Sequence, residues 1–365
     1  MKLSDVAHGR DNNFNLIRVL AALSVLISHS FALTSGNSDA QPFSHTLGMT
    51  LGTMAVDVFF ITSGYLVTAS LLSRKNAVEF VIARMLRIYP GLLVMLLLTV
   101  FGLGAYFTVL PLSSYLANGE TYHYLRRCLT LINGVSFELP GVFRTLPLKG
   151  EVNSSLWTLP YEIRMYGILL LLWMLDSLWK SKAQRVFDLV VMGIAIVAGG
   201  VTGFGHVTAT AVAAFWPLAF MFFSGSMFYV LKKRVILSKS VFLVFVFVLL
   251  VASINPRIFG MFYMLLIGYV LFFLAYVPSG WIRKYNTLGD YSYGIYIYAF
   301  PVQQTVVALY PGISLLHMTL ISMLVTLCFA VLSWHFVERH ALKLKSVCIQ
   351  HIEKAGFGYL GNRNN

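Results

Sequence analysis

Long apolar segments recur along almost the whole chain of 365 residues, and this pattern limits the possible folds more than any other feature. Each segment approaches the roughly 20 residues that a helix needs to cross the hydrocarbon core of a bilayer. Hydrophobic residues make up 58% of the sequence and charged residues only 11%, which excludes an ordinary soluble domain. We therefore expect an all-α, polytopic membrane protein with about ten transmembrane helices. The expected spans are 15–33, 52–73, 88–107, 157–176, 186–203, 208–230, 236–254, 258–277, 291–310 and 314–336.

The basic residues are distributed unevenly over the two sides of this arrangement. Most of the 27 lysines and arginines fall in the turns that end every second segment. By the positive-inside rule, those turns and both termini are cytoplasmic. A net charge of +13 could suggest a nucleic-acid partner, but basic residues placed in this way are explained by membrane topology. We therefore expect no nucleic-acid partner. The basic residues expected outside are Arg126, Arg127, Arg144, Lys149 and Arg257.

The cysteines and histidines give no sign of a metal site or a disulfide framework. Cys128, Cys328 and Cys348 fall in separate regions and form no C-x-x-C pair. The nine histidines are scattered and include no H-E-x-x-H pair. We therefore expect no bound metal.

The domain organisation is predicted to be simple. Residues 1–336 form one membrane domain, which starts with a retained helix because the first segment lacks a small-residue cleavage site. Residues 337–365 form a short basic cytoplasmic tail. The only long connection, 108–156, lies on the outer side, and loops of that length are usually functional or disordered. Its aromatic and basic residues favour a packed or partly re-entrant cover over a simple tether.

Ionisable residues within the expected membrane depth concentrate in the first, second and fourth segments, at Arg18, His29, Asp57, Glu162 and Arg164. Such groups are costly in lipid and normally mark an internal cavity or pathway. Arg18 and His29 are spaced so that a helix puts them on one face, about 16 Å apart along its axis. The ordinary alternatives are an arginine that snorkels to the interface and a histidine in a structural hydrogen bond.

Arg84 and Arg87 form a second basic group, in the stretch FVIARMLRIYP at the expected cytoplasmic start of the span 88–107. Residues three apart are neighbours on a helix surface, and guanidinium groups match the geometry of phosphate. This spacing indicates a phosphate-binding pair. The alternative is a flanking charge that only sets topology.

A third group of candidates consists of carboxylates. Pro160 suits the first turn of a helix and places Glu162 shallowly below the outer surface, and Asp57 is expected at a similar depth. Either carboxylate could orient His29 and stabilise its protonated form. Alternatively, one of them pairs with Arg164 and holds helices together.

Several stretches together resemble the acyltransferase-3 family of integral membrane O-acyltransferases. The combination is specific because the stretches occur in the family's order, although each one is short. They are NLIRVLAALSVLISH, VDVFFITSGYLV, FVIARMLRIYP, NSSLWTLPYE and LGDYSYGIYIYAFP, followed by FVERHALKL near the end.

The resemblance implies an enzyme that moves an acyl group, often acetyl, from cytoplasmic acyl-CoA to a hydroxyl of a cell-surface polysaccharide or lipid-linked glycan. It implies a bacterial plasma membrane protein with no permanently bound cofactor. His29 would act as general base or as a transient acyl carrier. One departure is YIYAFP, where many relatives have a histidine before the proline and this chain has Ala299 and Phe300. The resulting candidates are His29, Glu162 and Asp57 for catalysis, and Arg18, Arg84 and Arg87 for binding the donor.

Two other classes of function are alternatives to the enzyme. A secondary transporter or exporter could use the same buried charges, but it would be expected to show related halves, and no such repeat is visible. A non-catalytic scaffold of a glycan-handling complex would need the charges only as ion pairs. The acceptor glycan, the hydroxyl modified, the acyl chain and the oligomeric state are left open by the sequence.

Overall fold

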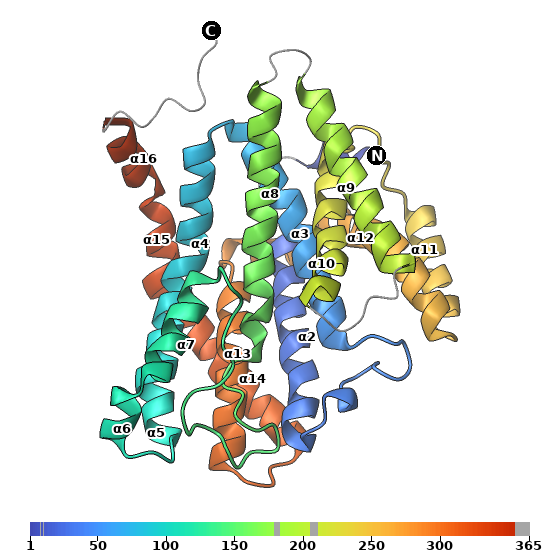
Figure 1. Ribbon diagram of the computed structural model, residues 1–365. Coiled ribbons are helices and arrows are strands. Elements are labelled where there is room, and N and C mark those ends of the chain that lie inside the picture. The colour runs from blue at the N-terminus through green and yellow to red at the C-terminus, as the bar shows by residue number, and fades with distance from the viewer. Residues whose placement is uncertain (8, 10, 179–182, 205–210, 355–365) are drawn as a thin grey trace. The chain divides into compact units, whose positions relative to one another are not determined.

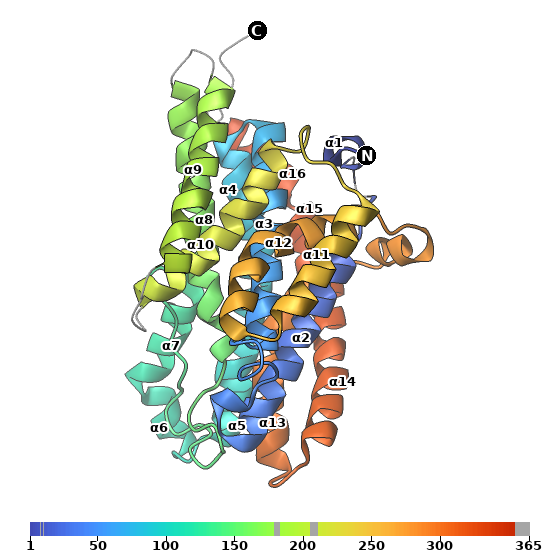
Figure 2. The same cartoon turned by 90° about the vertical axis from the view of Figure 1, so that its right-hand side faces the viewer.

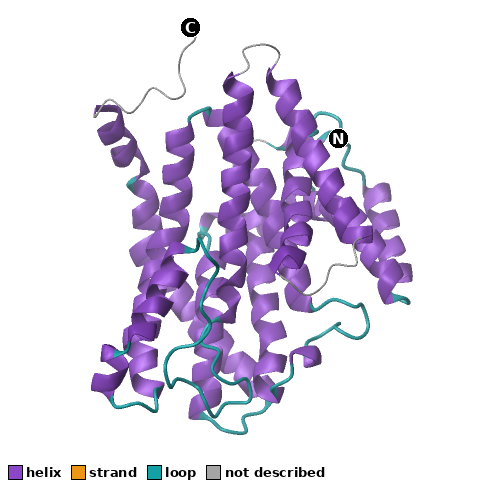
Figure 3. Ribbon diagram, viewed as in Figure 1, coloured by secondary structure: helices purple, strands orange, loops and turns teal. Residues whose placement is uncertain are grey.

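The computed structural model describes residues 1–354 except 8, 10, 179–182 and 205–210. Within these ranges the chain is helical, with loops and a few isolated bridges but no strand (Figure 3). The predicted all-α class is therefore confirmed. Four of the basic residues expected on the cytoplasmic side lie outside the described residues, namely Arg10, Lys180, Lys182 and Arg363. The first residues of the predicted span 208–230 lie outside them as well.

Every predicted span overlaps a helix of the structure. In the described part of the chain, 6 helices are long and apolar enough to cross a membrane. They are Phe14–Ser35, Leu51–Arg74, Ala77–Phe107, Val186–Gly203, Pro256–Tyr276 and Leu315–Ile352. The remaining predicted spans coincide with Leu159–Leu178, Ala211–Val230, Lys239–Ala252 and Ser292–Leu309, which are not among these 6. Of these, Lys239–Ala252 and the part Ala214–Val230 are apolar but shorter. A total of about ten spans, and cytoplasmic termini, stay predictions.

Large apolar side chains remain exposed on several of these helices. Phe247 is 65% exposed, Leu250 66% and Leu324 67%. Such surfaces would be unfavourable in water but suit contact with lipid. The exposed apolar side chains therefore agree with a membrane environment.

The chain forms two compact units, and the first comprises Met1–Ala21, Phe43–Lys75 and Arg164–Gly289. Helices α2 (Phe14–Ser35) and α8 (Leu159–Leu178) each belong partly to this unit and partly to the second. The other helices of the first unit are α1 (Leu3–Val6), α3 (Leu51–Arg74), α9 (Ala183–Phe204), α10 (Ala211–Val230), α11 (Lys239–Ala252), α12 (Pro256–Tyr276) and the 3₁₀ helix η4 (Gly280–Thr287).

Close backbone contact between α3 and α10 builds the core of the first unit (Figure 1). A Cβ atom at Gly64 would lie 1.8 Å from the carbonyl oxygen of Phe222, and one at Gly225 would lie 2.0 Å from that of Ile61. Only glycine fits at both positions, as is usual where membrane helices approach closely. One turn further along, the hydroxyl of Thr68 donates to Ser226 at 2.9 Å and fixes the register of the two helices.

The second unit comprises Ala22–Pro42, Asn76–Ile163 and Asp290–Asn365. Its helices are η1 (Ser38–Ala40), α4 (Ala77–Leu97), the π-helix η2 (Leu98–Gly104), α5 (Ala105–Phe107), α6 (Leu112–Ala117), α7 (Gly119–Thr130), η3 (Ser154–Thr158), α13 (Ser292–Leu309), α14 (Leu315–Ser333), the π-helix η5 (Trp334–Glu338), α15 (Arg339–Lys343) and α16 (Lys345–Lys354).

Helix α13 is the core of the second unit. Every residue from Ser292 to Pro301 is buried, which is the pattern of a helix surrounded on all sides. Helix α14 lies beside it in both views (Figures 1 and 2), and α15 and α16 lie along α4. The functional stretches of the second unit are therefore arranged around α13.

The predicted tail begins as an ordered part of the second unit. Glu338 is 1% exposed, and the ammonium group of Lys345 pairs with Glu79 of α4 at 2.6 Å. Residues 337–354 are almost entirely helical. The boundary between a domain at 1–336 and a tail at 337–365 stays a prediction.

The long connection 108–156 is packed, as the sequence led us to expect, and is no simple tether. Tyr115 and Tyr124 are both 0% exposed, and the Tyr115 hydroxyl donates to the carbonyl of Val100 at 2.9 Å. The thiol of Cys128 donates to the carbonyl of Ser136 at 3.3 Å. Burial raises the pKa of this thiol to about 11, so it stays neutral at physiological pH.

Candidate active site

His29 lies on α2, in the second unit. The residue keeps part of its surface accessible, whereas its Nδ1 atom is buried and has no hydrogen-bond partner among the described residues. The His29 ring contacts the ring of Phe300 on α13 in an edge-to-face arrangement, with centroids 5.3 Å apart and an interplanar angle of 78°. The imidazole is therefore fixed from one side by an aromatic ring. Phe300 lies in YIYAFP, the stretch in which the sequence was noted to lack the histidine of the family that it resembles.

The turn of α2 that carries His29 is also held by α13. The side-chain amide of Gln303 donates to the carbonyl of Leu26 and to the hydroxyl of Ser30, both at 2.8 Å. Gln303 is 0% exposed. These contacts bracket His29 along the helix, so the position of the imidazole depends on α13.

Helix α13 also holds the stretch that leads to Glu162. The Asn153 side chain donates to the carbonyl of Ile297 at 2.9 Å, and the hydroxyls of Thr158 and Tyr296 share a hydrogen bond of 2.6 Å. The Glu162 carboxylate acts electrostatically on Tyr296. Helix α8 begins at Leu159, so Pro160 lies in its first turn as predicted, and Glu162 lies in the same turn. The depth of Glu162 below the outer surface stays a prediction. A role for Glu162 in orienting His29 stays a prediction.

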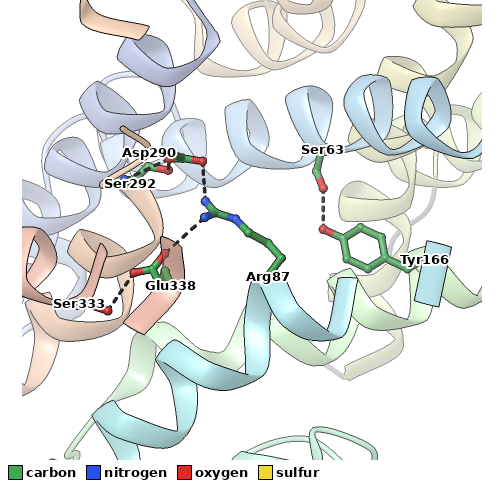
Figure 4. A network of polar contacts seen from close by, with 7 residues as sticks. All are labelled: Ser63, Arg87, Tyr166, Asp290, Ser292, Ser333 and Glu338. Atoms are coloured by element: carbon green, nitrogen blue, oxygen red, sulfur yellow. Dashed lines mark hydrogen bonds and ion pairs between the residues drawn. The ribbon is translucent and has the colours of Figure 1, made fainter. Parts of the chain in front are cut away.

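Arg87 is the centre of a polar network in the second unit (Figure 4). One terminal nitrogen of its guanidinium contacts Asp290 at 2.5 Å, and the other contacts Glu338 at 3.3 Å. Each carboxylate also accepts from a serine hydroxyl, Ser292 for Asp290 at 2.5 Å and Ser333 for Glu338 at 2.9 Å. The network therefore joins three stretches that are far apart in the sequence.

Two aromatic rings complete the surroundings of Arg87. The guanidinium carbon lies 5.6 Å from the ring centroid of Tyr293 and 6.0 Å from that of Trp334, within the range of cation–π attraction. The Arg87 side chain is only 15% exposed. Because two carboxylates already engage the guanidinium, a donor phosphate would have to compete with them.

The start of α4 differs from the prediction and changes the setting of both arginines. The helix begins at Ala77, where the Asn76 side chain accepts from the backbone N–H of Glu79 and caps it. Arg84 and Arg87 therefore lie about two and about three turns inside the helix, not at its start. The predicted boundary at 88 was wrong because it followed the apolar run, whereas the capping group determines where the helix begins.

Arg18 and Asp57 lie in the first unit. The Arg18 guanidinium lies 5.8 Å from the ring centroid of Phe59 on α3. Asp57 is 4% exposed and interacts electrostatically with the hydroxyl of Tyr263 on α12. Their proposed roles beside the donor and beside His29 stay predictions.

A hydrogen bond in the first unit links another family-like stretch to α8. The hydroxyls of Ser63, in VDVFFITSGYLV, and Tyr166 are 3.0 Å apart (Figure 4). Glycine contacts on α3 and this bond to α8 therefore fix two sides of the same helix.

Sequence reasoning missed the contact residues Asp290, Glu338, Phe300 and Gln303. The two acidic residues stand in quoted stretches, LGDYSYGIYIYAFP and FVERHALKL, and an acidic residue beside an apolar helix is itself a signal for a buried partner. Gln303 lies two residues after the end of LGDYSYGIYIYAFP, and a glutamine in an apolar helix likewise indicates a buried hydrogen-bond partner. In the described ranges, no group of three or more histidine, cysteine, aspartate or glutamate residues could hold a metal ion.

Comparison with known proteins gives a consistent set of relatives. The family model of the acyltransferase-3 type, described as an acyltransferase domain, matches residues 11–335. A protein named O-acetyl transferase from Shigella phage Sf6 is 30% identical over 353 residues, which cover 92% of this chain and 98% of the relative. Nodulation protein 10 from Rhizobium leguminosarum bv. viciae is 24% identical over 93% of this chain and 95% of its own length. No solved structure gives a significant match.

Proposed function

We propose that this chain, which belongs to the acyltransferase-3 family and is an acyl-transferring enzyme of a membrane, transfers an acyl group from cytoplasmic acyl-CoA to a hydroxyl of a cell-surface glycan. Acetyl is the proposed group because a relative that spans nearly the whole chain is named an O-acetyl transferase. The bacterial plasma membrane is the proposed location. Family membership favours the enzyme over the transporter and the scaffold.

The observation that carries this proposal is the setting of His29. A histidine in an apolar helix costs free energy, so its presence there indicates a function. This one is held by Phe300 and by the Gln303 contacts to its helix turn. Its ring keeps one nitrogen on the buried side, while part of the residue remains accessible. A fixed imidazole with an accessible edge suits proton transfer or nucleophilic attack.

Two routes are compatible with this geometry. As a general base, His29 takes the proton of the acceptor hydroxyl while the oxygen attacks the thioester carbonyl; the carbon–sulfur bond breaks and the proton passes to the departing CoA thiolate. As an acyl carrier, an imidazole nitrogen attacks the thioester, CoA leaves, and the hydroxyl then attacks the acyl-imidazole. Either Glu162 or Asp57 is the proposed carboxylate that would stabilise the imidazolium.

On the donor side, we propose that Arg84 contacts the CoA phosphates and that Arg18 is its companion along the donor. Guanidinium groups form strong, charge-assisted hydrogen bonds with phosphate. Arg87 was predicted for the same role, which stays a prediction, and its two carboxylate partners support a further contribution. We propose that Arg87 chiefly fixes α4 and thereby holds Arg84 in place.

The experiment that tests this function measures transfer from labelled acetyl-CoA by the purified protein in nanodiscs that contain lipid-linked glycans of the host. We expect His29→Ala to lower the turnover by at least roughly 10²-fold, because it removes the base or the nucleophile. His45→Ala is the matched control, since His45 is exposed and lies outside the expected spans. Near-normal transfer by a folded His29→Ala protein would refute the assignment.

A further inference from the structure

Gln303 makes an unusual set of contacts for a residue in the centre of an apolar helix. Its side chain is 0% exposed, and its amide nitrogen donates to both Leu26 and Ser30 on α2. The hydroxyl of Ser30 donates in turn to the carbonyl of Leu26 at 3.0 Å. The three groups therefore form a closed set of hydrogen bonds around a single turn of α2.

This arrangement is not what stability alone would favour. The Oε1 atom of Gln303 is buried and has no hydrogen-bond partner in the part of the chain that the structure describes. An unsatisfied buried polar atom costs about 1–3 kcal/mol, and a leucine of similar size would avoid that cost. A glutamine kept under these conditions calls for a functional reason.

His29 supplies that reason. It lies between Leu26 and Ser30 on the turn that Gln303 holds. Phe300, one turn before Gln303 on α13, contacts the ring of His29. Two residues on one face of α13 thus determine the position of the imidazole. Gln303 fixes the backbone turn that carries it, and Phe300 fixes the orientation of the ring.

We infer that Gln303 is a positioning residue for His29, an inference that rests on the proposed role of His29 in acyl transfer. By holding the turn, Gln303 keeps the backbone of His29 where Phe300 can fix the ring with Nδ1 buried, and Nε2 is the nitrogen that would meet the thioester or the acceptor hydroxyl. The imidazole then needs no rearrangement before it reacts. Such preorganisation affects the chemical step more than the binding of either substrate.

The test compares kcat and the donor KM for Gln303→Leu, measured by release of the CoA thiol from acetyl-CoA in glycan-containing nanodiscs. We expect kcat to fall by roughly 10- to 100-fold, because small displacements of a reacting group have effects of this size, while the donor KM changes little. Ser30→Ala removes one of the two acceptors and should give a smaller fall in kcat. The double variant should be no worse than Gln303→Leu alone, because both changes break the same set of contacts.

Thr326→Val is the matched control, since Thr326 of α14 is 0% exposed and its hydroxyl is likewise without a partner in the described ranges. It should leave kcat unchanged. If Gln303→Leu does not fold, Ser30→Ala tests the positioning role in its place, because it removes only one hydroxyl and is expected to leave folding intact.

The outcomes separate the inference from the proposed function. If His29→Ala abolishes transfer but neither Gln303→Leu nor Ser30→Ala lowers kcat, the positioning role is refuted and the function stands. If Gln303→Leu raises the donor KM and leaves kcat unchanged, the residue acts in binding and the inference is also refuted. Full activity in His29→Ala would overturn the proposed function itself.

Discussion

Replacing Arg87 by alanine should destabilise the protein, and the size of the effect can be worked out from its contacts. The change removes two ion pairs, one with Asp290 and one with Glu338, whose side chains are 14% and 1% exposed. Breaking a buried pair by removing one partner costs about 3–5 kcal/mol. We expect the free energy of unfolding to fall by about 3 kcal/mol, near the lower end of this range, because Ser292 and Ser333 still donate to the carboxylates.

The assay is reversible unfolding in mixed micelles with increasing sodium dodecyl sulfate, monitored by tryptophan fluorescence. Arg144→Ala is the matched control, because Arg144 pairs with Glu138 at 3.1 Å while the two side chains are 52% and 55% exposed. An exposed pair of this kind is worth roughly 0–1 kcal/mol. A double-mutant cycle of Arg87→Ala with Glu338→Gln should give a coupling energy of roughly 0.5–3 kcal/mol.

The same variants distinguish a positioning role from phosphate binding. If Arg87 mainly contacted the donor, Arg87→Ala would weaken donor binding by the roughly 1.5–3 kcal/mol of a charge-assisted hydrogen bond, which would appear as a higher donor KM, and would leave unfolding unchanged. Glu338→Gln would then have no corresponding effect on stability. Wild-type stability in Arg87→Ala would therefore refute the argument and return Arg87 to the donor site.

Two further predictions concern helix packing and the connection 108–156. Gly225→Ala should abolish folding into a monodisperse protein, judged by size-exclusion chromatography, because its Cβ would lie 2.0 Å from the carbonyl oxygen of Ile61; Gly193→Ala, with no atom within 4 Å of its Cβ, should be tolerated. Maleimide at pH 7.5 should label Cys348 but not Cys128 in the folded protein, because burial raises the pKa of the Cys128 thiol to about 11 and keeps the reactive thiolate scarce until the pH approaches that value. Rapid labelling of Cys128 without detergent denaturation would contradict this.

Local features of the sequence were sufficient to locate a helix at each of the expected spans. Length and apolar composition mark each span because every backbone polar group in lipid must be satisfied within the helix itself. Pro160 correctly indicated the first turn of α8 for the same reason, since it lacks an N–H that would be left without a partner. The start of α4 was misplaced because a polar cap at Asn76, and not apolarity, begins that helix.

The sequence by itself also determined which functional residues to consider, because His29, Arg84 and Arg87 stand in stretches with recognisable spacing. Only the tertiary structure decided what these residues contact. Arg87 meets carboxylates 203 and 251 residues away, and Gln303 reaches a carbonyl 277 residues away. Such partners depend on which helix faces pack together, and that choice is made by close contacts such as the fit of α13 against the turn of His29. No periodicity or motif records that fit, because the energy that selects it arises only when distant segments meet.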